Sequence, residues 1–213
     1  MASNPYIAGF SKVLGGWTGL VATTIGVTTA SITPTGRESA ISVWNALIKK
    51  SRLTHGGTWN GWVDSDGKLY IESSLSFDLT HTNLTRSRLG FASDSTSITS
   101  ITAPSAHSEG YYPKWVSFDG MDRIGDSARP VNGATGSIPL TQVHTSPNLE
   151  IMDTYSNIYT WQTVFAPSGY PPVFDLHLGG RELGRYLIED ARLFRPFKTM
   201  DYASLDLKIR GNA

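Results

Sequence analysis

The most regular hydrophobic pattern of the chain is a stripe of apolar side chains at helical spacing. Its members are Ala40, Val43, Trp44, Leu47 and Ile48. They fall at i, i+3, i+4, i+7 and i+8, which places them on one face of an α-helix. Two consecutive glycines at positions 56 and 57 end the pattern. We therefore predict one amphipathic helix near residues 38–52 that packs on its own sheet, with a partner-binding helix as the alternative.

After this helix the hydrophobic period changes from 3.6 to 2, which indicates strands. Residues 58–63 and 68–72 flank the sequence Asp64-Ser65-Asp66-Gly67, and an Asp-Gly turn between alternating residues is a strong hairpin signal. Residues 75–79 alternate again and predict a third strand with one buried face. Residues 38–91 thus form a helix, hairpin and strand unit that the sequence Leu89-Gly90-Phe91 closes.

The remaining chain is less regular. Residues 92–140 are rich in Ser, Thr, Gly and Pro and are predicted to be irregular, apart from a short strand around Ile98 and Ile101. A long irregular stretch in a compact domain is usually functional or ordered by a neighbour. A short helix at 149–158 is the alternative to a strand there. The other predicted strands lie at residues 149–165, 173–178, 186–189 and 203–209.

These elements predict a mainly β fold, a β-sandwich or a barrel-like structure with one helix, and α+β is the alternative class. Residues 1–36 are expected to form an N-terminal arm or strands, and residues 37–213 a single mainly β domain. The apolar segment 17–30 contains five threonines and two glycines. It therefore suits strands better than the continuous apolar core of a signal sequence.

Charge and cysteine usage exclude several classes of protein. The chain has 18 basic and 18 acidic residues and no cysteine. Binding to nucleic acid or to an anionic membrane normally requires a basic surplus, so neither partner is expected. No apolar run reaches the roughly 18 residues of a membrane span. The lack of cysteine removes disulfides, thiolate metal sites and a cysteine nucleophile together.

The residues that often carry catalysis or metal binding form no known motif here. The five histidines at positions 55, 81, 107, 144 and 177 lack the paired spacing of a zinc site. We expect ordinary surface or hydrogen-bonded histidines. Asp64, Asp66 and Gly67 match only part of a calcium loop, and a hairpin turn explains them better.

Three further patterns also fail as catalytic or cofactor signatures. Gly56-Gly57 and residues 133–137 (GATGS) are glycine-rich, but they do not follow a strand and open a helix, as phosphate-binding loops do. No Gly-x-Ser-x-Gly sequence is present. Asp119, Asp122 and Asp126 lie close in sequence, and hydrolysis of a glycan by two of them is a minor alternative. We predict no enzyme and no catalytic, cofactor-binding or metal-binding residues.

The six tryptophans suggest a second possibility, because aromatic faces stack on other rings. They lie at positions 17, 44, 59, 62, 115 and 161. Trp59 and Trp62 have opposite parity, so a regular strand points them to opposite faces and only one of them is available for a binding platform. Core or interface packing is the expected role of these residues, and glycan binding is the alternative.

Several segments resemble a pattern that recurs in structural proteins of tailed bacteriophages. In that pattern a helix precedes a hairpin with an Asp-Gly turn, an alternating strand, a Leu-Gly-Phe sequence and an aromatic-proline stretch. Near the C-terminus, the segments GRYLIED and FRPF and a final alternating strand also resemble phage tail proteins. The matching N-terminal elements are Trp44, Leu47, Asp66-Gly67, Phe77, Leu89-Gly90-Phe91 and Tyr112-Pro113-Lys114-Trp115.

The resemblance implies a virion component made in the bacterial host cytoplasm. A minor tail, tail-tip or baseplate subunit is expected, with capsid decoration or head–tail joining as alternatives. Its expected partners are other virion proteins and copies of itself, through residues 1–36 and 92–140. The competing hypothesis is a host-recognition module that binds a surface glycan.

Overall fold

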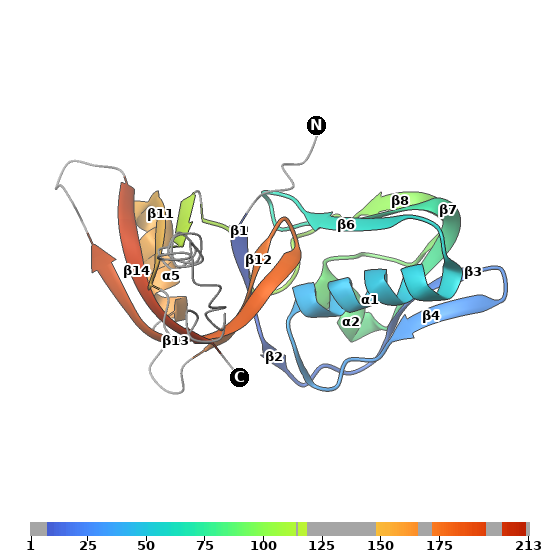
Figure 1. The fold of residues 1–213 in the computed structure, drawn as a ribbon, viewed down its shortest axis with the longest axis horizontal. Helices are drawn as coiled ribbons and strands as arrows, with labels where there is room; N and C mark the ends of the chain where they lie inside the picture. Colours follow the sequence, from blue (N-terminus) through green and yellow to red (C-terminus); the bar gives the residue numbers. More distant parts are fainter. Residues whose placement is uncertain (1–7, 114, 119–147, 166–171, 195–201, 212–213) are drawn as a thin grey trace, which may run out of the picture. The chain divides into compact units, whose positions relative to one another are not determined.

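The computed structural model describes residues 8–113, 115–118, 148–165, 172–194 and 202–211 (Figure 1). The structure is 51% strand and 23% helix, which confirms the mainly β prediction. Within this class the fold is α+β, the predicted alternative to a β-sandwich or barrel. One face of the sheet is covered by helix α1, whereas in a sandwich it would be covered by a second sheet.

The chain divides into two compact units. Unit 1 comprises Met1–Tyr112 and Asp175–Gly184, and unit 2 comprises Pro113–Phe174 and Arg185–Ala213. This differs from the predicted organisation, in which residues 37–213 form one domain. One boundary between the units lies between Tyr112 and Pro113. The other two lie inside β12 (Val173–Leu178) and β13 (Arg181–Phe194), so no linker separates the units there.

Unit 1 is built on an antiparallel sheet with a long central strand. The strand order is β4–β3–β7–β6, and β8 also pairs with β7. β3 and β6 pair with one edge of β7, and β8 pairs with the opposite edge. Leu79 lies between Thr23 of β3 and Ser95 of β8. Ile71 lies between Gly61 of β6 and Ile101 of β8. The elements are β3 (Val21–Ile25), β4 (Thr28–Ile32), α1 (Ala40–His55), β6 (Trp59–Val63), β7 (Leu69–His81), α2 (Asn83–Leu89) and β8 (Ser95–Thr102).

The predicted amphipathic helix is confirmed as α1. All five residues of its apolar stripe are buried, and α1 lies against β3, β4 and β6. The helix begins after Ser39, whose hydroxyl accepts a hydrogen bond from the Ser42 backbone N–H at 3.1 Å, which is standard N-capping. The same hydroxyl donates to the buried carboxylate of Asp175 at 2.5 Å. Ser39 therefore fixes both the helix start and its attachment to β12.

The predicted hairpin is also confirmed, but the separate third strand is wrong. β7 is a single strand of 13 residues that contains both predicted segments. Ser73 and Ser74 interrupt the apolar pattern in the sequence. In the structure, the side chains of β7 still alternate through them, because Ser73 is buried and Ser74 is exposed. A small hydroxyl side chain fits the buried row without breaking the alternation, so the strand continues through it.

Residues 8–38 contribute further strands to unit 1. β1 (Ala8–Lys12) pairs with β9 (Gly110–Tyr111), and β2 (Leu14–Gly15) pairs with β5 (Arg37–Glu38). Phe10 and Trp17 are buried. The described part of the predicted N-terminal segment thus consists of strands that are integrated into the unit.

Gly90 ends α2 in the left-handed conformation (φ 80°). A Cβ on Gly90 would lie 2.2 Å from the Ser105 carbonyl oxygen, whereas one on Gly26, also at positive φ (59°), would meet nothing within 4 Å. We expect Gly26→Ala to cost about 1 kcal/mol, from the left-handed backbone alone. Gly90→Ala should cost at least about twice as much, because backbone must move as well. Urea unfolding of both variants measures this, and equal costs would contradict it.

Unit 2 contains strands in the order β10–β11–β14–β13. Its further elements are β10 (Trp115–Phe118), β11 (Asn148–Thr154), α5 (Tyr155–Phe165) and β14 (Tyr202–Gly211). α5 lies against β11 and β14, and its Phe165 packs on Phe174 with ring centroids 5.2 Å apart. The predicted strand over 149–165 is therefore correct only in its first part, and the alternative helix at 149–158 is displaced towards the C-terminus.

Candidate functional site

A polar groove of about 350 Å³ lies on the β6–β7–β8 sheet of unit 1. It is lined by Thr58, Asn60, Glu72, Ser73, Ser74, Thr99 and Ser100. Asn60 is paired with Glu72 and Glu72 with Ser100 across the strands, so their side chains emerge side by side on one face. The lining offers hydroxyl, amide and carboxylate groups and no basic side chain.

The carboxylate of Glu72 is held in a fixed orientation. Its Oε1 accepts a hydrogen bond from Asn60 Nδ2 at 3.0 Å, and its Oε2 accepts one from the Tyr70 hydroxyl at 2.9 Å. Desolvation and then this hydrogen bond raise the pKa of Tyr70, so its hydroxyl remains a donor at neutral pH. A carboxylate oxygen has two lone pairs and can accept two hydrogen bonds. Glu72 thus retains acceptor capacity towards a ligand.

An aromatic pair lies on the same face of the sheet, two residues along each strand from Asn60 and Glu72. Trp62 pairs with Tyr70 in the register, and their rings are stacked with centroids 3.8 Å apart and an interplanar angle of 26°. Both residues are half-buried. Trp59, with the opposite parity, is fully buried and packs on Phe77. The predicted opposite orientation of these two tryptophans is confirmed by this geometry.

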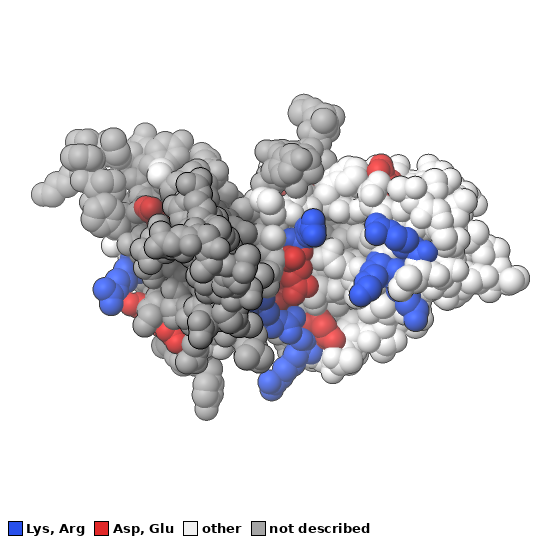
Figure 2. Space-filling model, viewed as in Figure 1, with Lys and Arg blue, Asp and Glu red and all other residues white. Residues whose placement is uncertain are grey.

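A second surface feature is the hairpin formed by β3 and β4, which we call the β3–β4 hairpin. It lies in a segment, residues 13–36, without any Lys, Arg, Asp, Glu or His. Figure 2 shows basic side chains over α1, while the end of unit 1 that carries the hairpin is white. At the hairpin tip, Val27 is fully exposed. β4 is also an edge of its sheet in the described part of the chain.

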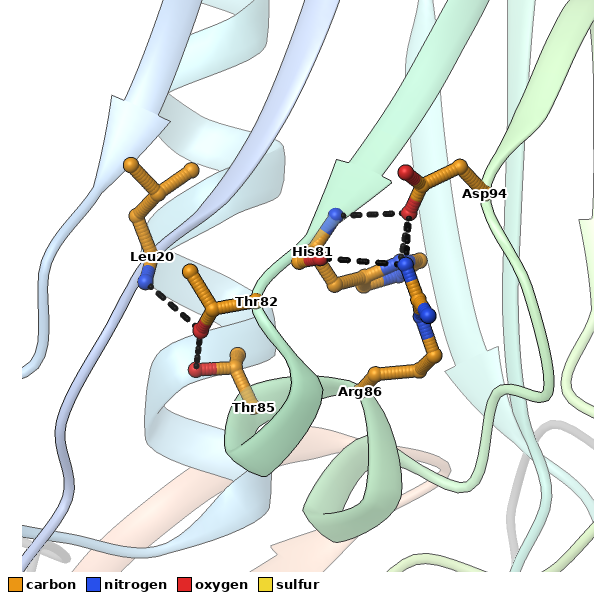
Figure 3. Close-up of polar contacts among 6 residues, drawn as sticks. All are labelled: Leu20, His81, Thr82, Thr85, Arg86 and Asp94. Carbon is orange, nitrogen blue, oxygen red and sulfur yellow. Dashed lines mark hydrogen bonds and ion pairs between the residues drawn. The ribbon is translucent and has the colours of Figure 1, made fainter.

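Figure 3 shows a cluster in which the carboxylate of Asp94 joins two neighbours. Asp94 Oδ1 accepts hydrogen bonds from Arg86 Nη2 at 2.8 Å and from the His81 backbone N–H at 2.9 Å, and it lies 3.3 Å from His81 Nδ1. Burial lowers the pKa of His81, and Asp94 offsets this in part. His81 is stacked on Phe91. A histidine that acts as a catalytic base needs a nucleophile within hydrogen-bond distance of its ring nitrogen. His81 Nε2 is buried and has no hydrogen-bond partner, so this cluster does not provide one. It anchors the segment after α2 to the end of β7.

His107 and His177 form a buried cluster around Tyr112. His107 Nε2 is hydrogen-bonded to the Tyr112 hydroxyl, and His107 Nδ1 lies 3.2 Å from the Ser108 carbonyl oxygen. His177 Nδ1 accepts a hydrogen bond from the Gly180 backbone N–H at 3.2 Å, and its Nε2 is buried without a partner. Tyr112 lies edge-on to both imidazole rings. The Gly180 contact requires a neutral His177 imidazole, and both histidines serve as hydrogen-bonded packing groups around Tyr112.

Burial has a large effect on the pKa values of this cluster. Desolvation lowers the pKa of His107 to about 4. Desolvation first, and the neighbouring His107 second, lower the pKa of His177 to about 3. Desolvation raises the pKa of Tyr112 well above its ordinary value. All three side chains therefore remain uncharged throughout the physiological pH range.

The remaining predicted residues are placed as follows. Asp64 Oδ1 accepts hydrogen bonds from the backbone N–H groups of Asp66 and Lys68, so these residues form the predicted hairpin turn. His55 Nε2 lies 3.2 Å from Thr23 Oγ1. Among the described residues, no group of three metal-ligating side chains is placed to hold an ion. His144, the three aspartates at 119, 122 and 126, and residues 133–137 lie outside the described residues.

Comparison with protein-family models, with curated proteins and with solved structures found no match. In the part of the chain that the structure describes, no helix is long and apolar enough to cross a membrane. Function is therefore inferred from the two surface features, the groove and the β3–β4 hairpin. No sequence motif marks Asn60, Tyr70, Glu72 or Ser100. The sequence indicates only that each of them is a polar residue in a segment that alternates between apolar and polar positions.

Proposed function

We propose that this chain is a structural subunit of a tailed-phage particle, in the tail, tail tip or baseplate, and that it acts through protein–protein assembly. The observation that carries the assembly role is the β3–β4 hairpin, with its charge-free sequence and its fully exposed Val27. The resemblance of residues 44–115 and of the C-terminal segments to phage tail proteins supports the type of particle.

The hairpin has the properties of a docking element. An edge strand presents unpaired N–H and C=O groups that can pair with another chain. Monomeric proteins usually protect such an edge with lysine, proline or an inward-pointing charge. The sequence of β4, Thr-Thr-Ala-Ser-Ile, contains none of these. Strand addition by a neighbouring subunit would satisfy this edge and bury Val27 in the same contact.

Val27→Asp is expected to weaken self-association at least tenfold, because a charge at the tip would have to be desolvated in the contact. The measurement is the mass in solution by light scattering over a concentration series. Leu53→Asp is the matched control, because Leu53 is a 75% exposed leucine on α1, outside the hairpin. It should leave the association curve unchanged.

Two results would count against this proposal. A wild-type protein that is monomeric at every concentration would refute self-assembly through the hairpin. Equal effects of Val27→Asp and Leu53→Asp would show that the contact is not specific to the hairpin. Deleting residues 1–15 would be a poorer test, because β1 is paired with β9 and contains the buried Phe10.

A further inference from the structure

We propose that the polar groove on the β6–β7–β8 sheet binds a neutral saccharide. Glu72, Asn60 and Ser100 would hydrogen-bond its hydroxyl groups, and Trp62 would stack on a sugar ring. This inference does not rest on the assembly role, because it uses a different surface of unit 1 and a different chemistry.

The lining of the groove selects the class of ligand. Seven polar residues surround it and none of them is Lys, Arg or His. An anionic ligand would meet the Glu72 carboxylate without any compensating positive charge, and an apolar ligand would leave the lining groups unpaired. A neutral polyol satisfies hydroxyl, amide and carboxylate groups at the same time. The volume of about 350 Å³ is at the lower end of the range for small-molecule sites.

The central groups are pre-organised for this task. Asn60 Nδ2 and the Tyr70 hydroxyl fix both oxygens of Glu72. The free lone pairs of the carboxylate and the Asn60 Oδ1 are then aligned acceptors, and Ser100 lies opposite Glu72 on β8. Adjacent hydroxyls of a sugar ring can donate to the two oxygens of one carboxylate. Binding would not have to order these side chains first, which saves conformational entropy.

The aromatic pair supplies the second half of the site. Stacking on Tyr70 fixes the plane of the Trp62 ring. Trp62 and Asn60 are two residues apart on β6 and share a face, so they are separated by roughly 7 Å along the strand. That separation suits a ring stacked on Trp62 whose neighbouring sugar hydrogen-bonds to Asn60 and Glu72. The C–H face of a pyranose is apolar, and it packs on an aromatic face for the same reasons that aromatic rings pack together.

A basic peptide is the competing ligand, because a carboxylate beside an aromatic ring can also hold a cation. The saccharide is favoured because each Glu72 oxygen already accepts a hydrogen bond from a neutral donor. This arrangement disperses the negative charge. The other lining residues, three serines and two threonines among them, add hydroxyl groups and no further charge.

The test uses the full chain on a microarray of neutral oligosaccharides and bacterial surface polysaccharides. Titration calorimetry then follows with the best saccharide and with tetralysine. We expect one neutral saccharide to bind, and Glu72→Gln and Trp62→Ala each to weaken it at least tenfold. Trp62→Phe should retain most of the affinity, because it keeps an aromatic face. Asp66→Asn, a carboxylate-to-amide change in the exposed turn outside the groove, should have no effect.

Each other outcome overturns the inference. Binding to no saccharide on the array would refute it, as would saccharide binding that the Glu72 and Trp62 variants leave intact. Binding of tetralysine alone, lost in Glu72→Gln, would identify a cation site instead. Circular dichroism of each variant verifies that it is folded. Light scattering of Glu72→Gln should match the wild type, which separates failure of this site from failure of assembly.

Discussion

Trp44→Ala is expected to lower the free energy of unfolding by about 4 kcal/mol, as is typical of replacing a buried tryptophan by alanine. The Trp44 side chain is 1% exposed and lies at the centre of the apolar stripe of α1. Its ring centroid is 5.6 Å from that of Phe91, and its Nε1 donates a hydrogen bond to the Tyr70 carbonyl oxygen at 3.1 Å. Alanine would leave both a cavity and a buried carbonyl without this partner.

The measurement is urea unfolding followed by circular dichroism, with hydrogen exchange of the α1 amides to assign the loss to unit 1. Trp44→Phe serves as the control, because it retains most of the apolar contact and loses only the indole N–H. It should cost less than half as much as Trp44→Ala. A Trp44→Ala protein as stable as the wild type would show that α1 does not depend on this contact.

Lowering the pH from 7 to 4 is expected to reduce the free energy of unfolding by several kcal/mol, on the order of 5, through the two buried histidines. The pKa values are about 4 for His107 and about 3 for His177 in the folded protein, against about 6.5 in an unfolded chain. Between these values the unfolded state binds more protons than the folded state. The contribution of the two neutral histidines to the free energy of unfolding is therefore fully present above pH 6.5, and it is lost as the pH decreases towards 4.

Urea unfolding at several pH values tests this dependence. His177→Asn keeps an acceptor for the Gly180 N–H and removes the titrating ring. Between pH 6.5 and 4, the number of protons taken up on unfolding should therefore fall by about one, and the unfolding free energy should depend less steeply on pH. An unchanged slope in this variant would contradict the assignment. As a second measurement, the imidazole NMR signals of His107 and His177 should not shift between pH 7 and 5 in the folded protein.

The parts of the fold that could be predicted are those that local pattern determines. The α1 stripe follows a 3.6 period, and the Asp64–Gly67 turn has its own chemistry, so both were found in the sequence. The short strand predicted around Ile98 and Ile101 is confirmed as β8 (Ser95–Thr102), although the surrounding Ser and Thr residues favour a loop. It forms a strand because the free edge of β7 supplies its hydrogen-bond partners. α5 was expected to be a strand because Tyr, Ile, Trp, Thr and Val favour strands, and packing on unit 2 overrides that preference.

The candidate site was predictable only in part, for a related reason. Parity along one strand showed that Trp59 and Trp62 face opposite sides. The grouping of Asn60, Glu72 and Ser100 depends on the register between three strands, and β8 is separated from β7 by α2. One sequence does not specify such a register. The buried histidine cluster likewise joins residues 107 and 177, which no local pattern connects.

The division of unit 1 has a consequence for the order in which the protein folds on the ribosome. Unit 1 uses residues far along the chain: Asp175 accepts from Ser39, His177 packs on Tyr112, and the Gly180 carbonyl oxygen accepts from Asn45 Nδ2. These residues are synthesised only after the first 62 residues of unit 2, Pro113–Phe174, have emerged. Residues 1–112 therefore cannot complete unit 1 by themselves, and the last contacts of this unit form only after residues 113–174 have been synthesised.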